Sequence, residues 1–118
     1  MRCFVRRTSS LDRIPVDQVE LAYGDILDPA SIATAIAGCD GLIHLASISD
    51  WREINSPNIR EIAVQGSQNV LGAVTAAGDL RSVFVSSISA INGTDEPEVM
   101  TEETPYTIQE KIPFLDTK

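Results

Sequence analysis

Gly41-Leu42-Ile43-His44-Leu45-Ala46 is the stretch that decides the fold, because it is almost continuously apolar. Strands that helices cover on both faces have this character, whereas strands with one solvent-exposed face alternate apolar and polar residues. We therefore predict a buried parallel strand over residues 41–46. A long helix is predicted next, from the helix-start pair Ser56-Pro57 to about Ala77, because apolar residues recur there on one stripe before Gly78.

The flanking segments repeat this alternation of short apolar runs and helical patterns. Further strands are predicted over residues 2–6, 18–23 and 82–86. Asp28-Pro29 begins a shorter helix, because aspartate caps helices and proline suits their first position, and Gly38 ends it. A loop is predicted over residues 88–112 and a last helix from near Pro113. This order favours an α/β fold with a parallel sheet.

The composition indicates one globular domain. The chain has 118 residues, of which 43% are apolar and 22% charged, a balance typical of a soluble protein with one core. No apolar run approaches the roughly 18 residues of a membrane span, and the N-terminal apolar run is too short for a signal peptide. Cys3 and Cys39 are expected to be reduced thiols. These features predict a cytoplasmic protein.

Charge and histidine content disfavour several function classes. The net charge of −8 repels phosphate backbones, so nucleic-acid binding is not expected. His44 is the single histidine, and we interpret it as a core or wall residue of its strand. A metal site is therefore not predicted, and a serine hydrolase would need His44 itself as its base.

Polar side chains are expected to gather at the carboxyl ends of the strands, where ligands bind in open parallel sheets. Arg6 and Arg7 follow the first predicted strand, Asp25 follows the second, and serines follow the other two. A basic pair, one carboxylate and a row of hydroxyls suit a phosphorylated nucleotide better than they suit a metal.

Five stretches carry a family resemblance by their order and spacing. They are residues 19–28 (Val-Glu-Leu-Ala-Tyr-Gly-Asp-Ile-Leu-Asp), 35–40 (Ala-Ile-Ala-Gly-Cys-Asp), 43–46 (Ile-His-Leu-Ala), 66–71 (Gly-Ser-Gln-Asn-Val-Leu) and 83–87 (Val-Phe-Val-Ser-Ser). Together they resemble the extended short-chain dehydrogenases/reductases, the NAD(P)-dependent epimerase/dehydratase family, in its dihydroflavonol-reductase-like branch. The resemblance implies a partial Rossmann-like domain over residues 1–118, a doubly wound parallel sheet whose strands are equivalent to the family's second to fifth.

The resemblance also implies where a cofactor binds. Arg6 and Arg7 match the position that meets the adenosine ribose, where arginine favours the 2′-phosphate of NADP over NAD. Asp25 and Ile26 match the pair that frames the adenine. The segment under the ribose and phosphates corresponds to Leu45, Ala46 and Ser47. Two simpler interpretations stay open: a solvated basic turn for the arginines, and a turn-forming role for the aspartate.

The catalytic positions of the family are only partly matched. Ser87 matches the serine that hydrogen-bonds the substrate oxygen, and Ser86 is the alternative because the register is ambiguous by one residue. Lys118 matches the catalytic lysine, whereas Phe114 stands where the family has its tyrosine. A phenyl ring cannot transfer a proton, and the loss of a positioned acid or base typically costs about 10²–10⁴-fold in rate.

Three hypotheses follow from these matches and departures. In the first, the chain is a fragment of an NADP-dependent reductase or epimerase for a small carbonyl or hydroxyl compound. It is then expected to lack the glycine-rich strand-turn-helix and the C-terminal substrate part. The second is a non-catalytic relative that binds nucleotide or a partner, because Phe114 replaces the tyrosine and Ala63 replaces a usual asparagine. The third is an inactive truncated product.

A missing first strand would have a direct structural consequence. That strand is central in the doubly wound order 3-2-1-4-5, so its absence leaves two strand pairs with open inner edges. Unpaired buried backbone groups cost about 1–3 kcal/mol each. We therefore expect either that the two pairs close the gap by pairing directly or that the chain folds poorly alone.

Overall fold

A computed structural model describes residues 1–48, 56–78, 80–91, 94 and 97–107. The elements are β1 (Arg2–Val5), β2 (Glu20–Tyr23), α1 (Pro29–Ile36), β3 (Gly41–His44), the π-helical turn η2 (Glu61–Gln65), α2 (Gly66–Ala77), β4 (Arg81–Phe84) and the 3₁₀ turn η3 (Ile88–Ala90). All four predicted strands and the two predicted helices of this part are confirmed. The strands are shorter than predicted, and the helix expected near Pro113 lies outside the described residues.

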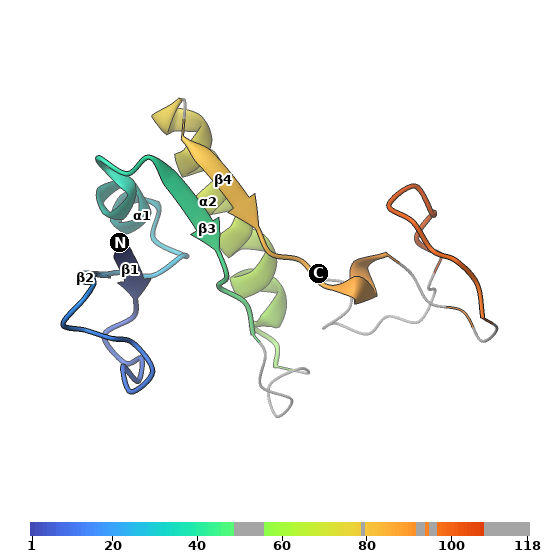
Figure 1. The fold of residues 1–118 in the computed structure, drawn as a ribbon, viewed down its shortest axis with the longest axis horizontal. Coiled ribbons are helices and arrows are strands. Elements are labelled where there is room, and N and C mark those ends of the chain that lie inside the picture. The colour runs from blue at the N-terminus through green and yellow to red at the C-terminus, as the bar shows by residue number, and fades with distance from the viewer. Residues whose placement is uncertain (49–55, 79, 92–93, 95–96, 108–118) are drawn as a thin grey trace.

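The strands form two separate parallel pairs (Figure 1). β1 pairs with β2 from Arg2–Glu20 to Val5–Tyr23, and β3 pairs with β4 from Gly41–Arg81 to His44–Phe84. Within the described residues, no pairing joins β1 to β3. The predicted division into two pairs is confirmed, and the two pairs have not closed the gap between them.

Local chemistry sets both ends of α1 as the sequence predicts. The Ala30 N–H donates to the Asp28 carboxylate at 3.1 Å, and Pro29 begins the helix. Gly38 follows the helix with φ 72°, a left-handed conformation that glycine adopts without strain. The cap, the proline and the glycine together explain why this short helix begins and ends where it does.

The long helix differs from the prediction at its start. We predicted one continuous helix from residue 56 to about residue 77, but helical backbone begins at residue 59 and the π-helical turn η2 interrupts it before α2. The Gly66 N–H donates to the Glu61 carbonyl, five residues earlier, so one extra residue is accommodated there. Such turns occur mostly as single insertions in helices, often beside functional sites. Gly78, with φ 80°, closes α2 as predicted.

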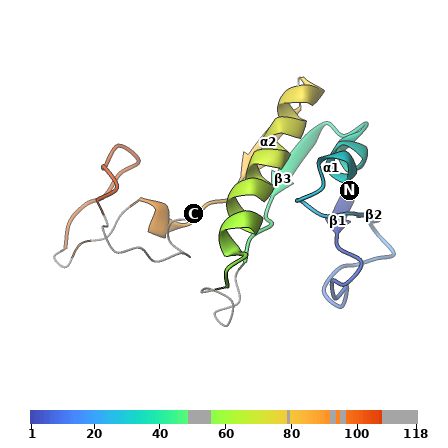
Figure 2. The same ribbon diagram turned by 180° about the vertical axis from the view of Figure 1, so that it is seen from behind.

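The core lies between the helices and one side of the strands. α2 runs along one face of the β3–β4 pair, and α1 packs against α2 and β2 (Figures 1 and 2). The buried apolar side chains come mainly from the two helices and the turn before α2: Ile32, Ala35, Ile59, Ala63, Val70 and Val74. Few large side chains share this core, so each contributes strongly to stability.

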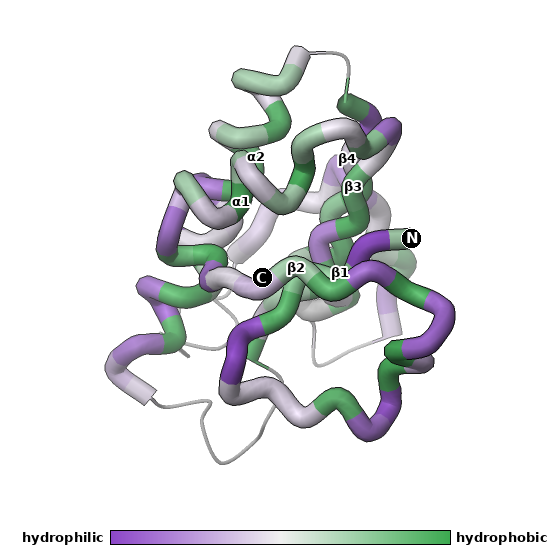
Figure 3. Tube along the Cα trace, turned by 90° about the vertical axis from the view of Figure 1, so that its left-hand side faces the viewer, coloured by the Kyte–Doolittle hydropathy of each residue, from purple (hydrophilic) through white to green (hydrophobic). Residues whose placement is uncertain are grey.

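The opposite face of β3–β4 is exposed, which corrects the prediction of a strand covered on both faces. Ile43 and Leu45 are 67% and 70% exposed, and Val83 and Val85 are 56% and 60% exposed. These alternate positions lie on the face away from α2, and the hydropathy view shows hydrophobic residues along both strands (Figure 3). Within the described part of the chain, no helix covers this face, although the apolar sequence suits a covered one.

Arg2 ties the first strand to the end of α1. Its guanidinium donates to the carbonyl oxygens of Ala35 at 2.6 Å and Ala37 at 2.9 Å, where the helix leaves carbonyls without intrahelical partners. Its Nε also lies 2.9 Å from a carboxylate oxygen of Glu20 on β2. That carboxylate raises the pKa of Arg2. One side chain thus connects three elements and places the first strand against the helix.

Candidate functional site

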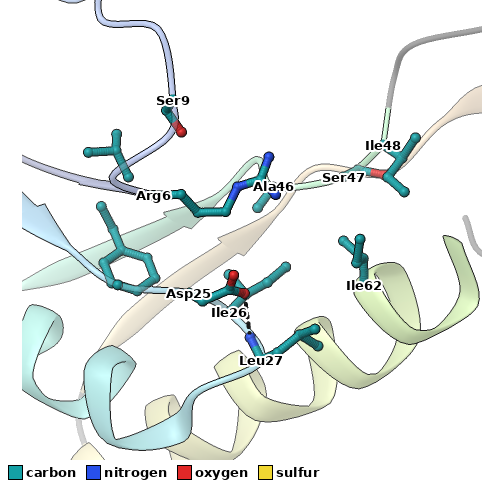
Figure 4. A pocket seen from close by; sticks show the side chains of 12 residues that line it. Arg6, Ser9, Asp25, Ile26, Leu27, Ala46, Ser47, Ile48 and Ile62 are labelled. Carbon is teal, nitrogen blue, oxygen red and sulfur yellow. Dashed lines mark hydrogen bonds between the residues drawn. The ribbon is translucent and has the colours of Figure 1, made fainter. Parts of the chain in front are cut away.

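A cavity of about 340 Å³ opens at the carboxyl ends of β1, β2 and β3 (Figure 4). It is lined by residues 4–6, Ser9, residues 24–27, residues 46–48 and Ile62. Five predicted site residues are among them: Arg6, Asp25, Ile26, Ala46 and Ser47. The lining therefore joins segments from separate parts of the chain, at the sheet edge where a ligand was expected.

Asp25 builds the turn that forms the floor of this cavity. Its carboxylate accepts the Leu27 N–H at 3.0 Å, drawn as the dashed line in Figure 4. Its own N–H donates to the Ser31 hydroxyl oxygen at 3.2 Å, and that hydroxyl donates to the Asp25 carbonyl at 3.0 Å. The turn-forming interpretation of Asp25 is thus confirmed, and the same residue lines the cavity.

The two arginines after β1 occupy different surroundings. Arg6 lines the cavity, and Figure 4 shows its side chain extending from the end of β1 into the space drawn beside Ala46. The Arg7 guanidinium carbon instead lies 5.0 Å from the centroid of the Tyr23 ring, a cation–π distance. Of the two arginines, Arg6 is therefore the one that lines this cavity.

Other predicted positions lie apart from the cavity or outside the described residues. Leu45 precedes the lining segment and has its side chain mostly exposed, whereas Ser86 and Ser87 follow β4 and do not line the cavity. Their proposed roles stay predictions. Phe114 and Lys118 lie outside the residues that the structure describes.

Sequence reasoning missed Gly24 and Ile62 as parts of the cavity wall. Gly24 is packed so closely that a Cβ atom would lie 2.5 Å from both the Phe4 ring and the Ser31 hydroxyl. The Gly24-Asp25 pair was visible in the sequence as the end of a strand. The periodicity of the long helix places Ile62 on its apolar stripe, but it does not indicate that this residue reaches the cavity.

His44 is a satisfied core residue, as predicted. It is buried between β3 and α2, its Nε2 lies 3.1 Å from the Ser67 hydroxyl, and its ring meets Phe84 edge-on at 5.0 Å. Burial lowers the pKa of His44 below its usual value. Among the described residues, no cluster of three or more histidine, cysteine or acidic side chains could hold a metal ion.

The depressed pKa of His44 predicts a pH-dependent stability. An unfolded histidine titrates near 6.5, so below that pH the unfolded chain binds a proton that the folded chain resists. The contribution of neutral His44 to the free energy of unfolding is complete well above pH 6.5, and it is lost as the pH falls toward the pKa of His44 in the folded chain. We expect urea midpoints to drop between about pH 7.5 and 5.5, and to drop less in His44→Gln. An equal drop in both proteins would assign the effect to carboxylates.

A second cavity, of about 450 Å³, lies between the C-terminal halves of α1 and α2. The residues that line it are apolar and mostly small, with several alanines beside Ile36, Cys39 and Leu80. None of the predicted site residues reaches it. Cys3 and Cys39 are free thiols in half-buried positions. No helix in the described part is long and apolar enough to cross a membrane.

Comparisons with known proteins find reductases among the curated relatives. Cinnamoyl-CoA reductase 1 from Oryza sativa subsp. japonica is 34% identical over 93 residues, which cover 77% of this chain and 26% of the relative. Cinnamoyl-CoA reductase 1 from Petunia hybrida is 38% identical over 94 residues, with 77% and 27% coverage. The chain therefore spans about a quarter of the length of these curated relatives.

Solved structures agree in fold. A short-chain dehydrogenase/reductase superfamily protein from Agrobacterium tumefaciens, solved with bound NAD, gives a TM-score of 0.71 at 27% identity, covering 99% of this chain and 34% of that one. The dTDP-glucose 4,6-dehydratase from Streptomyces venezuelae, also with NAD, gives 0.73 at 30% identity, with 88% and 33% coverage. The two parallel pairs and their helices are thus part of a Rossmann-like α/β fold.

The match to a family profile covers nearly the whole chain. The profile of the 3-beta hydroxysteroid dehydrogenase/isomerase family matches residues 4–118. This result confirms the resemblance to extended short-chain dehydrogenases/reductases that the five ordered stretches indicated. The chain therefore belongs to the 3-beta hydroxysteroid dehydrogenase/isomerase family, among the reductases, epimerases and dehydratases of the short-chain dehydrogenase/reductase type.

Proposed function

We propose that the cavity at the strand ends binds the adenosine end of a nicotinamide dinucleotide, and that it prefers NADP to NAD. The observation that carries this proposal is Arg6, which lines the same cavity as Asp25 and Ile26. The cavity volume of about 340 Å³ falls within the range of small-molecule sites, about 300–1,000 Å³. Its lining of one guanidinium, one carboxylate, two serines and apolar walls fits a phosphorylated nucleoside.

Each lining residue has a physical role in this proposal. A guanidinium presents a planar set of donors that suits a phosphate, so Arg6 would pair with the 2′-phosphate of NADP. Asp25 and Ile26 would frame the adenine. The small side chains of Ala46 and Ser47, after Leu45, would let the backbone approach the ribose and phosphates. Arg7 remains a candidate for the same phosphate, although Tyr23 holds it in the structure.

The whole protein's activity is proposed from its relatives. Bound NADP would supply hydride transfer, and we propose a reductase or epimerase that acts on a small carbonyl or hydroxyl substrate. Ser87, or Ser86 in the alternative register, would hydrogen-bond the substrate oxygen, and Lys118 would lower the pKa of a proton donor. Two observations support this class: curated relatives are reductases, and solved neighbours are NAD-bound.

One sequence observation favours a second candidate, a nucleotide-binding protein without catalysis. Phe114 occupies the position where the family has tyrosine, and its ring has no proton to give. NADPH oxidation in the presence of small aldehydes and ketones separates the two candidates. Turnover supports the reductase, whereas NADPH binding without turnover, followed by a gain of activity in Phe114→Tyr, supports loss of a proton donor. No gain in Phe114→Tyr supports a binding protein.

Thermal unfolding with and without NADPH and NADH tests the binding proposal. A ligand that binds only the folded chain stabilises it by about 2.7 kcal/mol at a hundred times its Kd, which raises the midpoint by several degrees. We expect NADPH to raise the midpoint at lower concentration than NADH. Midpoints that neither nucleotide moves would refute binding, and equal shifts would refute the preference for NADP.

A further inference from the structure

The cavity wall at Ile26 is held by a residue from a distant part of the chain. Asn69, on α2, donates from its side-chain Nδ2 to the Ile26 carbonyl oxygen at 2.9 Å, in a partly buried position. The two residues are 43 positions apart in sequence. The Asp25 turn satisfies its other groups locally, through Leu27 and Ser31, so the bond from Asn69 is what connects this turn to α2.

The neighbouring contacts set the direction of the Asn69 amide. Gln65 Nε2 donates to the Asn69 Oδ1 at 3.0 Å, so the oxygen of the amide faces Gln65. The amide nitrogen is thereby turned toward Ile26, because the two ends of a side-chain amide point in opposite directions. A short chain of hydrogen bonds, from Gln65 through Asn69 to Ile26, orients the group that holds the cavity wall.

Ile26 is also packed closely against the backbone of α2. A Cβ atom on Gly66 would lie 2.4 Å from Ile26 Cδ1 and 2.8 Å from Cγ1, so the helix backbone rests directly on the Ile26 side chain. That side chain has the helix on one side and the cavity on the other. Contact alone prevents Ile26 from moving toward α2, whereas the bond from Asn69 prevents its backbone from moving away.

We propose that Asn69 is a positioning residue for the nucleotide: it holds the Ile26 backbone at the distance from α2 that leaves room for the adenine end. This inference rests on the proposed function of the cavity. Asn69 does not itself line the cavity. Without its donor, the Ile26 carbonyl loses its bond to α2, and the wall becomes free to shift within the contact that Gly66 allows. Binding of the adenosine end then has to reorder the wall, which weakens affinity.

The test compares two changes of amide to carboxylate on one helix. Asn69→Asp keeps the shape but cannot donate, and it places a negative charge beside a carbonyl oxygen. Gln68→Glu makes the same chemical change at an exposed position one residue earlier, and serves as the matched control. Both proteins and the unaltered chain are titrated with adenosine 2′,5′-bisphosphate and with NADPH, and their unfolding midpoints are recorded without ligand.

We expect Asn69→Asp to weaken both ligands by the same factor, about threefold to tenfold, which is the scale of one lost hydrogen bond. Equal factors are expected because both ligands share the adenosine end. Gln68→Glu should leave both affinities unchanged. A merely structural role would lower the unfolding midpoint without changing affinity well below that midpoint. Asn69→Gln, which keeps a donor amide, should recover part of the affinity.

The outcomes distinguish the positioning role of Asn69 from the proposal that the cavity binds a nucleotide. If the unaltered chain binds neither ligand, the proposed function fails and the role of Asn69 fails with it. If the unaltered chain binds and Asn69→Asp binds equally well, only the positioning role is overturned. If Asn69→Asp does not fold at the working temperature, Asn69→Ala removes the donor without adding charge, and the same comparison applies to it.

Discussion

Replacing Ile32 with alanine is expected to lower the free energy of unfolding by about 2–5 kcal/mol, the usual effect of removing a fully buried isoleucine side chain. Ile32 lies on α1 and is 2% exposed. α1 packs on both α2 and β2, so a cavity at Ile32 weakens the contact between the helices and the first strand pair. The free energy of unfolding of a typical domain is about 5–15 kcal/mol in total, so this single change removes a large share of the stability.

Urea denaturation measures this effect, with two variants as controls. Ile32→Val removes one methylene and should cost about 0.5–1.5 kcal/mol. Leu71→Ala, on the exposed side of α2, should change stability by at most about 0.5 kcal/mol, because Leu71 is 54% exposed. Equal losses in Ile32→Ala and Leu71→Ala would contradict the core described here.

Replacing Arg6 with alanine is expected to weaken NADPH binding by about 10- to 100-fold and to leave NADH binding nearly unchanged. A charge-assisted bond to a phosphate is worth about 1.5–3 kcal/mol, and every 1.4 kcal/mol is a factor of ten. NADH lacks the 2′-phosphate, so it loses little. Arg6→Lys should recover part of the NADPH affinity, because lysine keeps the charge but not the planar set of donors.

Arg81→Ala is the matched control for this experiment. It removes the same charge at an exposed residue that begins β4, at the end of the strands opposite the cavity. Dissociation constants for both nucleotides, measured by fluorescence or calorimetry, give the selectivity of each protein. A similar loss in Arg6→Ala and Arg81→Ala would mean that net charge, not a local contact, governs binding. An equal loss of NADPH and NADH in Arg6→Ala would contradict the 2′-phosphate assignment.

Features set by neighbouring residues could be predicted from the sequence. Asp28, Pro29 and Gly38 define α1 by capping and backbone conformation, which need no tertiary information. The apolar runs predicted each strand, and the doubly wound strand order predicted two parallel pairs. The shortened strands and the π-helical turn η2 were not predictable, because they depend on pairing register and on how Ala63 and Gly66 fit against other elements.

The site was predictable in part for the same reason. Parallel strands carry their carboxyl ends to one edge, so Arg6, Asp25 and Ala46 could be placed together from strand positions alone. The separation of Arg6 from Arg7 could not, because it depends on where the Tyr23 ring lies. Asn69 was missed because its partner is a backbone carbonyl 43 residues away. Every residue has a backbone carbonyl, so the residue types do not indicate which one an asparagine binds.

The location of bound NADPH on the chain tests the central claim most directly. Backbone amide NMR signals of the isotopically labelled chain, followed during titration with NADPH, report which segments the nucleotide touches. The cavity described here predicts that the largest changes fall on residues 4–6, 24–27 and 46–48, while Cys39 and Leu80 at the second cavity stay unchanged. Changes confined to that second cavity or to the segment after β4, or a spectrum that NADPH leaves unaltered, would contradict the account.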